Sequence, residues 1–165
     1  MRRILAFVIG VVCVGGLAGC YTARSSVPSH IKTIAIPVFA NKSLQAAVED
    51  ELTQKVIDRF QTNNQLRLAE PGEANAELDG TITAYTNRVY RFNNQEKADE
   101  YIVTITLDAA VLDRVKNREL WSQEGIHASA TYLISGAQAR TEADARKEVV
   151  AQLADILLSR TVEGW

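Results

Sequence analysis

The side chains best suited to nucleophilic or metal chemistry in this sequence are two histidines, His30 and His127, and two cysteines, Cys13 and Cys20. A zinc site needs three or four ligands at suitable spacings, and a catalytic nucleophile needs a base placed beside it. Neither histidine has such neighbours in the sequence, and no P-loop, dinucleotide fingerprint or zinc-protease motif occurs. The sequence therefore predicts no catalytic residues, no metal site and no cofactor.

Cys20 is the side chain whose sequence context predicts a modification. It follows a basic pair at positions 2 and 3, an apolar run from Ile4 to Val14, and small residues that end in Leu17-Ala-Gly-Cys20. This order is typical of a secretory signal peptide, and the run is shorter than the roughly 20 apolar residues of a spanning helix. The final tetrad resembles the lipobox of bacterial lipoproteins, which implies lipid on the Cys20 sulfur and an acylated N-terminus. Two or more acyl chains anchor a protein stably.

This reading divides the chain into three parts: a signal peptide over residues 1–19, the lipidated cysteine and a short tether over 20–29, and one domain over 30–165. Cys13 lies in the signal peptide, so the mature protein has no cysteine left for a disulfide in the oxidising periplasm. Tyr21 follows Cys20, and lipoproteins without aspartate at that place resemble those sorted to the outer membrane. We therefore expect a lipid-anchored protein on the periplasmic side of the outer membrane.

The charge balance argues against nucleic acid as a partner. The chain has 18 basic and 20 acidic residues, and removal of Arg2 and Arg3 with the signal peptide leaves a formal charge of −4. A mildly acidic protein gains little from counterion release on a polyphosphate.

Basic residues gather in two places that could bind an anion. One cluster comprises Arg88, Arg91 and Lys97, and the other Arg114, Lys116 and Arg118. They flank the two turns of a predicted three-stranded meander, whose successive turns lie at opposite ends of the sheet. The shared strand extends about 43 Å at 3.3 Å per residue, so the clusters are not expected to form one site. Each cluster is consistent with a solvated hairpin tip, the second especially because Asp113 and Glu119 flank it, and the first is the better candidate for an anionic ligand.

The elements that must position these residues follow from hydrophobic periodicity. A strand is expected over 31–39, with Pro37 near its end. A helix is expected over 44–61, with Ser43 as its N-cap, because an apolar residue occurs at every fourth position from Leu44 to Phe60. A short strand at 66–68 then pairs parallel with the first strand.

The second half of the chain predicts antiparallel strands and a final helix. Strands are expected over 77–92, 101–113 and 119–132, followed by a helix that begins at Thr141, with Asp144 as its partner in a capping box. Threonines alternate with apolar residues in these strands, so one sheet face should be apolar and the other polar. The predicted fold is an α+β two-layer sandwich, with a mixed sheet of four to five strands and two helices on one face.

The order of these features resembles a known family. The lipobox is followed by Ile31-Lys-Thr-Ile-Ala-Ile-Pro-Val-Phe-Ala-Asn-Lys-Ser43 and an amphipathic helix, and then by Ala76-Glu-Leu-Asp-Gly-Thr-Ile-Thr83, the turn from Asp113 to Trp121, Ser129-Ala-Thr-Tyr132 and Glu163-Gly-Trp165. This pattern resembles the LptE family of lipopolysaccharide-assembly lipoproteins across essentially the whole mature chain. One departure is Lys116-Asn117, where relatives often have Thr-Gly.

The resemblance implies a non-enzymatic role. Members of this family occupy the lumen of the outer-membrane β-barrel LptD, help that barrel to assemble and to export lipopolysaccharide to the cell surface, and also bind lipopolysaccharide. Arg88, Arg91 and Lys97 are candidate lipopolysaccharide contacts because arginine and lysine are preferred donors to lipid A phosphates. A face rich in threonine, with Thr104 and Thr106, would suit the polar lumen of a barrel, although any half-covered sheet has such a face.

A different class of protein has a similar opening. The strand and helix after Ile31 also resemble TolB-type amino-terminal domains and lipoproteins that activate peptidoglycan synthases. Those regulators often have a long disordered tether, whereas Tyr21–Ser29 spans at most about 30 Å. The alternative function is therefore a periplasmic regulator, and the short tether favours a role close to the membrane.

Overall fold

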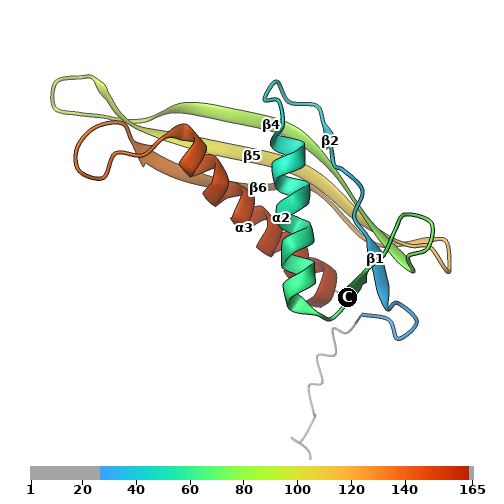
Figure 1. Ribbon diagram of the computed structural model, residues 1–165. Coiled ribbons are helices and arrows are strands. Elements are labelled where there is room, and N and C mark those ends of the chain that lie inside the picture. The colour runs from blue at the N-terminus through green and yellow to red at the C-terminus, as the bar shows by residue number, and fades with distance from the viewer. Residues whose placement is uncertain (1–26, 164–165) are drawn as a thin grey trace, which may run out of the picture.

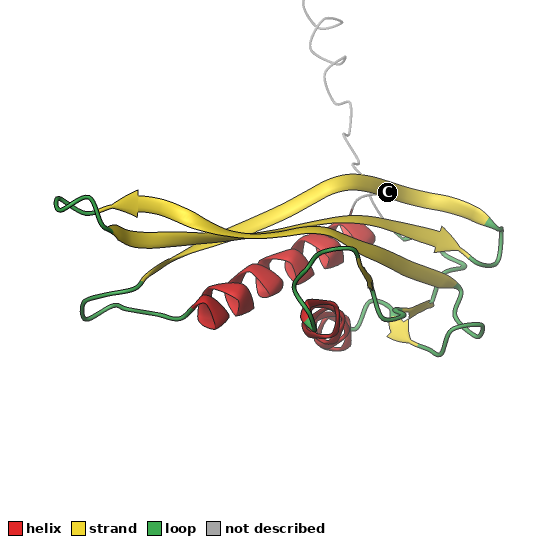
Figure 2. Ribbon diagram, turned by 90° about the horizontal axis from the view of Figure 1, so that it is seen from above, coloured by secondary structure: helices red, strands yellow, loops and turns green. Residues whose placement is uncertain are grey.

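The computed structural model describes residues 27–163, so the signal peptide, Cys20 and most of the tether lie outside the described residues. The described part is an elongated α+β domain in which two helices cover one face of a single sheet (Figures 1 and 2). The elements are β1 (Thr33–Ala35), β2 (Ala40–Asn41), α2 (Val48–Asn63), β3 (Arg67–Leu68), β4 (Ala76–Phe92), β5 (Ala98–Asp113), β6 (Arg118–Leu133) and α3 (Glu142–Glu163). The fold class is the one that the sequence predicts.

The sheet has six strands rather than four or five. Its order is β3-β1-β4-β5-β6, and β2 pairs separately with β4. The expected strand over 31–39 is divided because Pro37, which has no N–H to give to a ladder, follows β1, and the chain pairs again only at Ala40. The parallel pairing of β1 with β3 across α2 is confirmed.

Three long antiparallel strands form the rest of the sheet and set its length. β4 pairs with β5 from Ala76↔Asp113 to Phe92↔Ala98, and β5 pairs with β6 from Glu100↔Leu133 to Asp113↔Arg118. The β4–β5 turn and the β5–β6 turn therefore lie at opposite ends of the molecule (Figure 2). We call them the distal hairpin (residues 86–102) and the proximal hairpin (residues 111–120).

The core lies between the sheet and the helices. On β5, Val103, Ile105, Leu107 and Val111 are fully buried, while the threonines between them are half-buried on the other face. Phe60 and Leu52 of α2 and Leu153 and Leu157 of α3 complete the same core. The predicted apolar and polar faces of the meander are therefore confirmed. We call the uncovered polar side of the sheet the open face.

The start of α2 differs from the prediction. The helix begins at Val48, after Ala47 in a left-handed conformation, and Ser43 is not its N-cap. The segment before it is held by Asn41, whose side chain accepts from the main chain and hydroxyl of Ser43 and donates to the Gln45 carbonyl and to Glu49. Leu44, which fits the periodicity of the helix, is consequently fully exposed in this segment.

The start of α3 agrees with the prediction. The Thr141 hydroxyl accepts a hydrogen bond from the Asp144 main chain at 3.1 Å, and the Asp144 carboxylate accepts from the Thr141 main chain at 3.0 Å. These reciprocal bonds satisfy two N–H groups at the first turn of the helix, as a capping box does.

Candidate functional site

The distal hairpin brings the first basic cluster together. Its turn is ordered by Asn93, whose side-chain oxygen accepts hydrogen bonds from the main chains of Gln95 and Lys97, while its own main chain donates to the Lys97 carbonyl at 2.8 Å. Such local side-chain bonds fix a turn without help from the rest of the fold. The tip therefore extends beyond both helices as a defined structure rather than as a loose loop (Figure 1).

Arg88 and Arg91 lie on the open face of this hairpin. Arg88 pairs with Ile102 and Arg91 pairs with Glu100, two residues that alternate with the buried face of β5, and directly paired residues share a face. Both arginines and Lys97 are exposed. Arg91 is 3.3 Å from Glu100, so part of its charge is already balanced. The acidic groups of the same tip are Glu96, Asp99 and Glu100.

Exposed apolar side chains alternate with the arginines. Tyr90 and Phe92 are 61% and 60% exposed, and Val89 is 37% exposed. Large side chains of this kind rarely gather in solvent unless they contact a ligand, a partner or a lipid phase. Sequence reasoning weighed only the charges here, although the apolar residues between and after the arginines in Arg88-Val-Tyr-Arg-Phe92 were visible in the sequence. The tip therefore offers cations and apolar surface together, which suits an amphipathic anion.

A polar network joins the base of the distal hairpin to the helices. Glu142 of α3 accepts hydrogen bonds from the Tyr85 hydroxyl at 2.6 Å and from the Asn87 amide at 2.8 Å, and Asn87 also donates to the Tyr132 hydroxyl. The Tyr132 ring stacks on Tyr101 with 5.6 Å between centroids. Burial, and then the bond to Glu142, raise the pKa of the Tyr85 hydroxyl above its ordinary value, so it remains a donor at all physiological pH values.

The proximal hairpin holds the entry of the chain into the domain. His30 lies 2.8 Å from the carboxylate of Asp113, whose side chain is fully buried. Burial alone raises the pKa of Asp113, but hydrogen bonds from the Lys116 main chain, from His30 and from the Val115 main chain outweigh it and hold the pKa below its ordinary value. Asp113 therefore stays ionised and fixes both the turn and the segment that leads to the tether.

The second basic cluster has acidic neighbours within the domain. Arg114 lies 3.5 Å from Glu77, and Arg118 lies 3.7 Å from Asp113. All three basic residues are exposed, as expected for a solvated tip. The two clusters are at opposite ends of β5 and do not form one site.

Residues 27–163 contain neither a cluster of metal-ligating side chains nor a helix that could span a membrane. No three histidine, cysteine or carboxylate side chains gather there to hold a metal ion. His127 bonds the Gly125 carbonyl through Nδ1 at 3.0 Å, and His30 bonds Asp113. Neither described helix is long and apolar enough to cross a membrane.

A family model now identifies this arrangement of strands and helices. The model described as "LptE: Lipopolysaccharide-assembly" matches residues 31–161, which is nearly the whole described domain. The chain belongs to the LptE family. Members of the LptE family are non-enzymatic outer-membrane lipoproteins, and the assignment gives this protein a role in lipopolysaccharide assembly.

Solved structures show the same fold at low sequence identity. A lipoprotein B from Nitrosomonas europaea matches with a TM-score of 0.56 and 15% identity, covering 83% of this chain and 84% of that chain. A minor lipoprotein from Acinetobacter baumannii matches with a TM-score of 0.52 and 18% identity, covering 83% and 94%. A protein from Xanthomonas campestris matches at 0.52 and 14%, covering 82% and 88%. No curated protein sequence matches this LptE-family chain.

Proposed function

We propose that this LptE-family protein is the plug and assembly partner of an LptD-type outer-membrane β-barrel, and that its distal hairpin binds lipopolysaccharide during export. The observation that carries the proposal is the exposed mixture of arginines and aromatic side chains at the distal tip of a domain of this family. The protein acts without catalysis, through its shape and its hydrogen-bonding surface.

The polarity of the open face favours a position inside a barrel. Its central rows are Thr86, Thr104 and Ser129 and, next to them, Ala84, Thr106 and His127, each row being formed by directly paired residues of β4, β5 and β6. All of these side chains except that of His127 are short, and all except that of Ala84 are polar. Barrel lumens are themselves polar, so such a surface can approach the wall and exchange hydrogen bonds with it or with trapped water.

The side chains of the distal tip favour a phosphorylated, acylated ligand. Arg88, Arg91 and Lys97 can donate to phosphate oxygens, and hydrogen bonds of this charge-assisted kind are stronger than neutral ones. Tyr90 and Phe92 offer apolar surface beside these cations, as an acyl chain requires. Glu96, Asp99 and Glu100 weaken the local positive field, so the expected affinity comes from both kinds of contact together.

The lipid anchor proposed at Cys20 sets the orientation. The tether enters the domain at the proximal end, where His30 is held by Asp113. β5 spans about 53 Å from there to the distal hairpin, at 3.3 Å per residue over its 16 residues. The ligand-binding tip is thus held far from the end of the domain that carries the tether. The lipid anchor keeps that end at the periplasmic side of the outer membrane.

The direct test is affinity purification of the tagged, full-length protein from solubilised outer membranes, with quantitative mass spectrometry of the bound material. The proposal predicts one large β-barrel in near-equal molar amount. Recovery of only a peptidoglycan synthase would contradict it and favour the regulator alternative. In cells that produce a Cys20→Ser variant instead of the wild type, the protein should be released from the membrane fraction.

A further inference from the structure

One edge of the sheet is long and only partly protected. β3 at one edge has two residues, whereas β6 at the other edge has 16 and pairs only with β5. An edge strand presents main-chain N–H and C=O groups that can pair with another strand, and proteins usually protect such edges with lysine, proline, bulges or covering loops. The parts of the β6 edge that lack such protection are therefore candidate docking sites for another strand.

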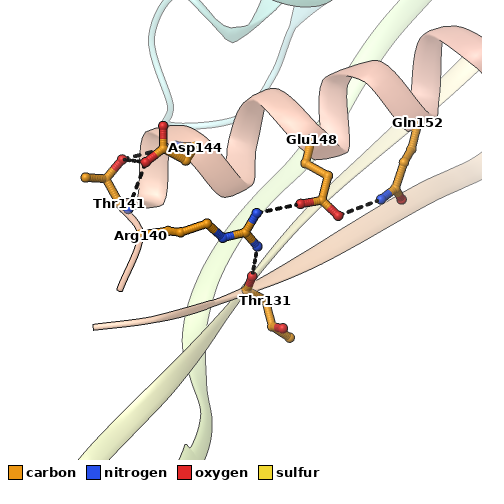
Figure 3. A network of polar contacts seen from close by, with 6 residues as sticks. All are labelled: Thr131, Arg140, Thr141, Asp144, Glu148 and Gln152. Carbon is orange, nitrogen blue, oxygen red and sulfur yellow. Dashed lines mark hydrogen bonds and ion pairs between the residues drawn. The ribbon is translucent and has the colours of Figure 1, made fainter. Parts of the chain in front are cut away.

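The distal end of the β6 edge is covered by Arg140. Its main-chain N–H donates to the Leu133 carbonyl at 2.9 Å, and its guanidinium donates to the Thr131 carbonyl at 2.6 Å and to Glu148 of α3 at 3.0 Å. Figure 3 shows the guanidinium between β6 and α3, with Glu148 in turn bonded to Gln152. These contacts establish that the carbonyls of residues 131 and 133 face outward, away from β5.

The other end of the edge is interrupted at Gly125. A register shift lies opposite this glycine, which has a φ of 67°, and its N–H donates to the Asp108 carboxylate. Its carbonyl is bonded by the His127 ring. A bulge with its main chain satisfied by side chains does not accept a further strand.

Between these two ends lies a window over Ile126–Ala130. Register is continuous from Ile126↔Leu107 to Leu133↔Glu100, and alternate residues of a strand direct their main chains to opposite sides. His127 and Ser129 therefore face outward like Thr131, and no outward hydrogen bond to either main chain occurs within residues 27–163. The window contains no lysine and no proline, and both residues are exposed.

We infer that the Ile126–Ala130 edge of β6 is a docking site for an extended segment of the barrel partner, which adds there as a further strand. The inference rests on the proposed function for the identity of that partner. Alternating donors and acceptors along an edge match an extended polypeptide and no lipid or simple anion. The side chains of Ser129 and Thr131 are short, and the His127 ring is held against the Gly125 carbonyl, so the edge has room for a neighbouring strand.

The size of the window distinguishes the barrel from a second copy of this chain. A stable interface between two proteins usually buries more than about 1,000 Å², which a five-residue strand does not provide by itself. A partner that already surrounds the domain supplies the remaining contacts. The window then contributes part of the affinity and determines the register and orientation of the domain within the barrel.

The test compares two substitutions at one residue in the full-length, membrane-anchored protein. Ser129→Pro removes an outward N–H that the β5–β6 ladder does not use, so edge geometry tolerates it, whereas Ser129→Ala keeps that N–H. We expect Ser129→Pro to lower the molar ratio of co-purified barrel at least threefold and Ser129→Ala to leave it unchanged. Thermal unfolding of each variant checks that both variants are folded.

Photo-crosslinking provides a second measurement that does not depend on the folding of the proline variant. A crosslinking residue at His127 should capture the barrel in cells, and the same residue at Lys116, exposed in the proximal hairpin at the anchored end, should not. Equal barrel recovery with both Ser129 variants, or a His127 crosslink to a second copy or to another protein, would overturn the inference. Absence of any barrel with the wild-type protein would instead refute the proposed function, so the two failures are distinguishable.

Discussion

At the scale of single residues, two positions determine local order although neither lies on a ligand-binding surface. Gly80 of β4 is packed so closely that a Cβ there would lie 2.9 Å from the Phe39 ring. Asp113 is the buried carboxylate that holds the proximal turn and His30 together. Each is explained by a specific contact, and each leads to a measurable effect on stability.

Gly80→Ala should destabilise the domain by about 1–3 kcal/mol, because the added methyl must displace a buried ring in a close-packed core. Urea unfolding followed by circular dichroism measures this change. The double variant Gly80→Ala/Phe39→Leu should recover part of the loss, since leucine leaves space for the methyl. A Gly80→Ala variant as stable as the wild type would show that the ring is not confined there.

Asp113→Asn should change how stability depends on pH. The pKa of Asp113 is lowered in the folded state, so its contribution is fully present above its ordinary pKa of 3.8 and is lost as the pH falls through the lower folded value. The wild type should therefore be more stable than Asp113→Asn at pH 5, and the difference should shrink below pH 4. Glu73→Gln, at an exposed turn, is the control. A difference that stays constant from pH 5 to pH 2.5 would contradict the assignment.

The charge of the distal tip gives a third prediction. Arg88→Glu/Arg91→Glu should weaken lipopolysaccharide capture at least tenfold, because one charge-assisted hydrogen bond contributes about 1.5–3 kcal/mol and about 1.4 kcal/mol is a factor of ten. Lys32→Glu/Lys116→Glu makes the same change in net charge at exposed positions away from the tip. Capture of purified lipopolysaccharide on beads measures both. Equal capture by the two double variants would exclude the tip as the binding site.

At the scale of elements, long segments with a clear period were predictable, whereas of the short strands β3 was predicted and β2 was not. The three long strands and α3 are placed within a few residues because their alternation and helical repeat are sustained. Around Leu44 the helical repeat was misleading, since the Asn41 hydrogen bonds hold that segment in a non-helical conformation. β2 was missed because two residues carry no periodic signal, and the β6 window depends on Arg140, whose contacts are tertiary.

The capping box of α3 tests whether this element is set by local sequence. Thr141→Ala should destabilise the domain by about 1 kcal/mol, because the Asp144 N–H loses its side-chain acceptor and keeps only the Thr141 carbonyl. Thr141→Ser keeps the hydroxyl and should change stability by no more than a few tenths of a kcal/mol. Equal loss in both variants would indicate that packing of the threonine methyl, rather than capping, matters.

At the scale of the whole molecule, the candidate site was predictable in part. Arg88, Arg91 and Lys97 do share one hairpin, and sequence alone placed the second basic cluster at the other end of the meander. The exposure of Tyr90 and Phe92 depends on how far the helices cover the sheet, which no local pattern specifies. The same incomplete cover leaves the open face and the β6 edge available to a surrounding partner.

The role that we propose for this protein is to deliver lipopolysaccharide to the cell surface together with an outer-membrane barrel. The most direct measurement is the amount of lipopolysaccharide exposed on intact cells after depletion of the protein, with the wild-type chain restored as the control. The account predicts that surface lipopolysaccharide falls together with the level of correctly assembled barrel, and that both return on restoration. Unchanged surface lipopolysaccharide in depleted cells would contradict it.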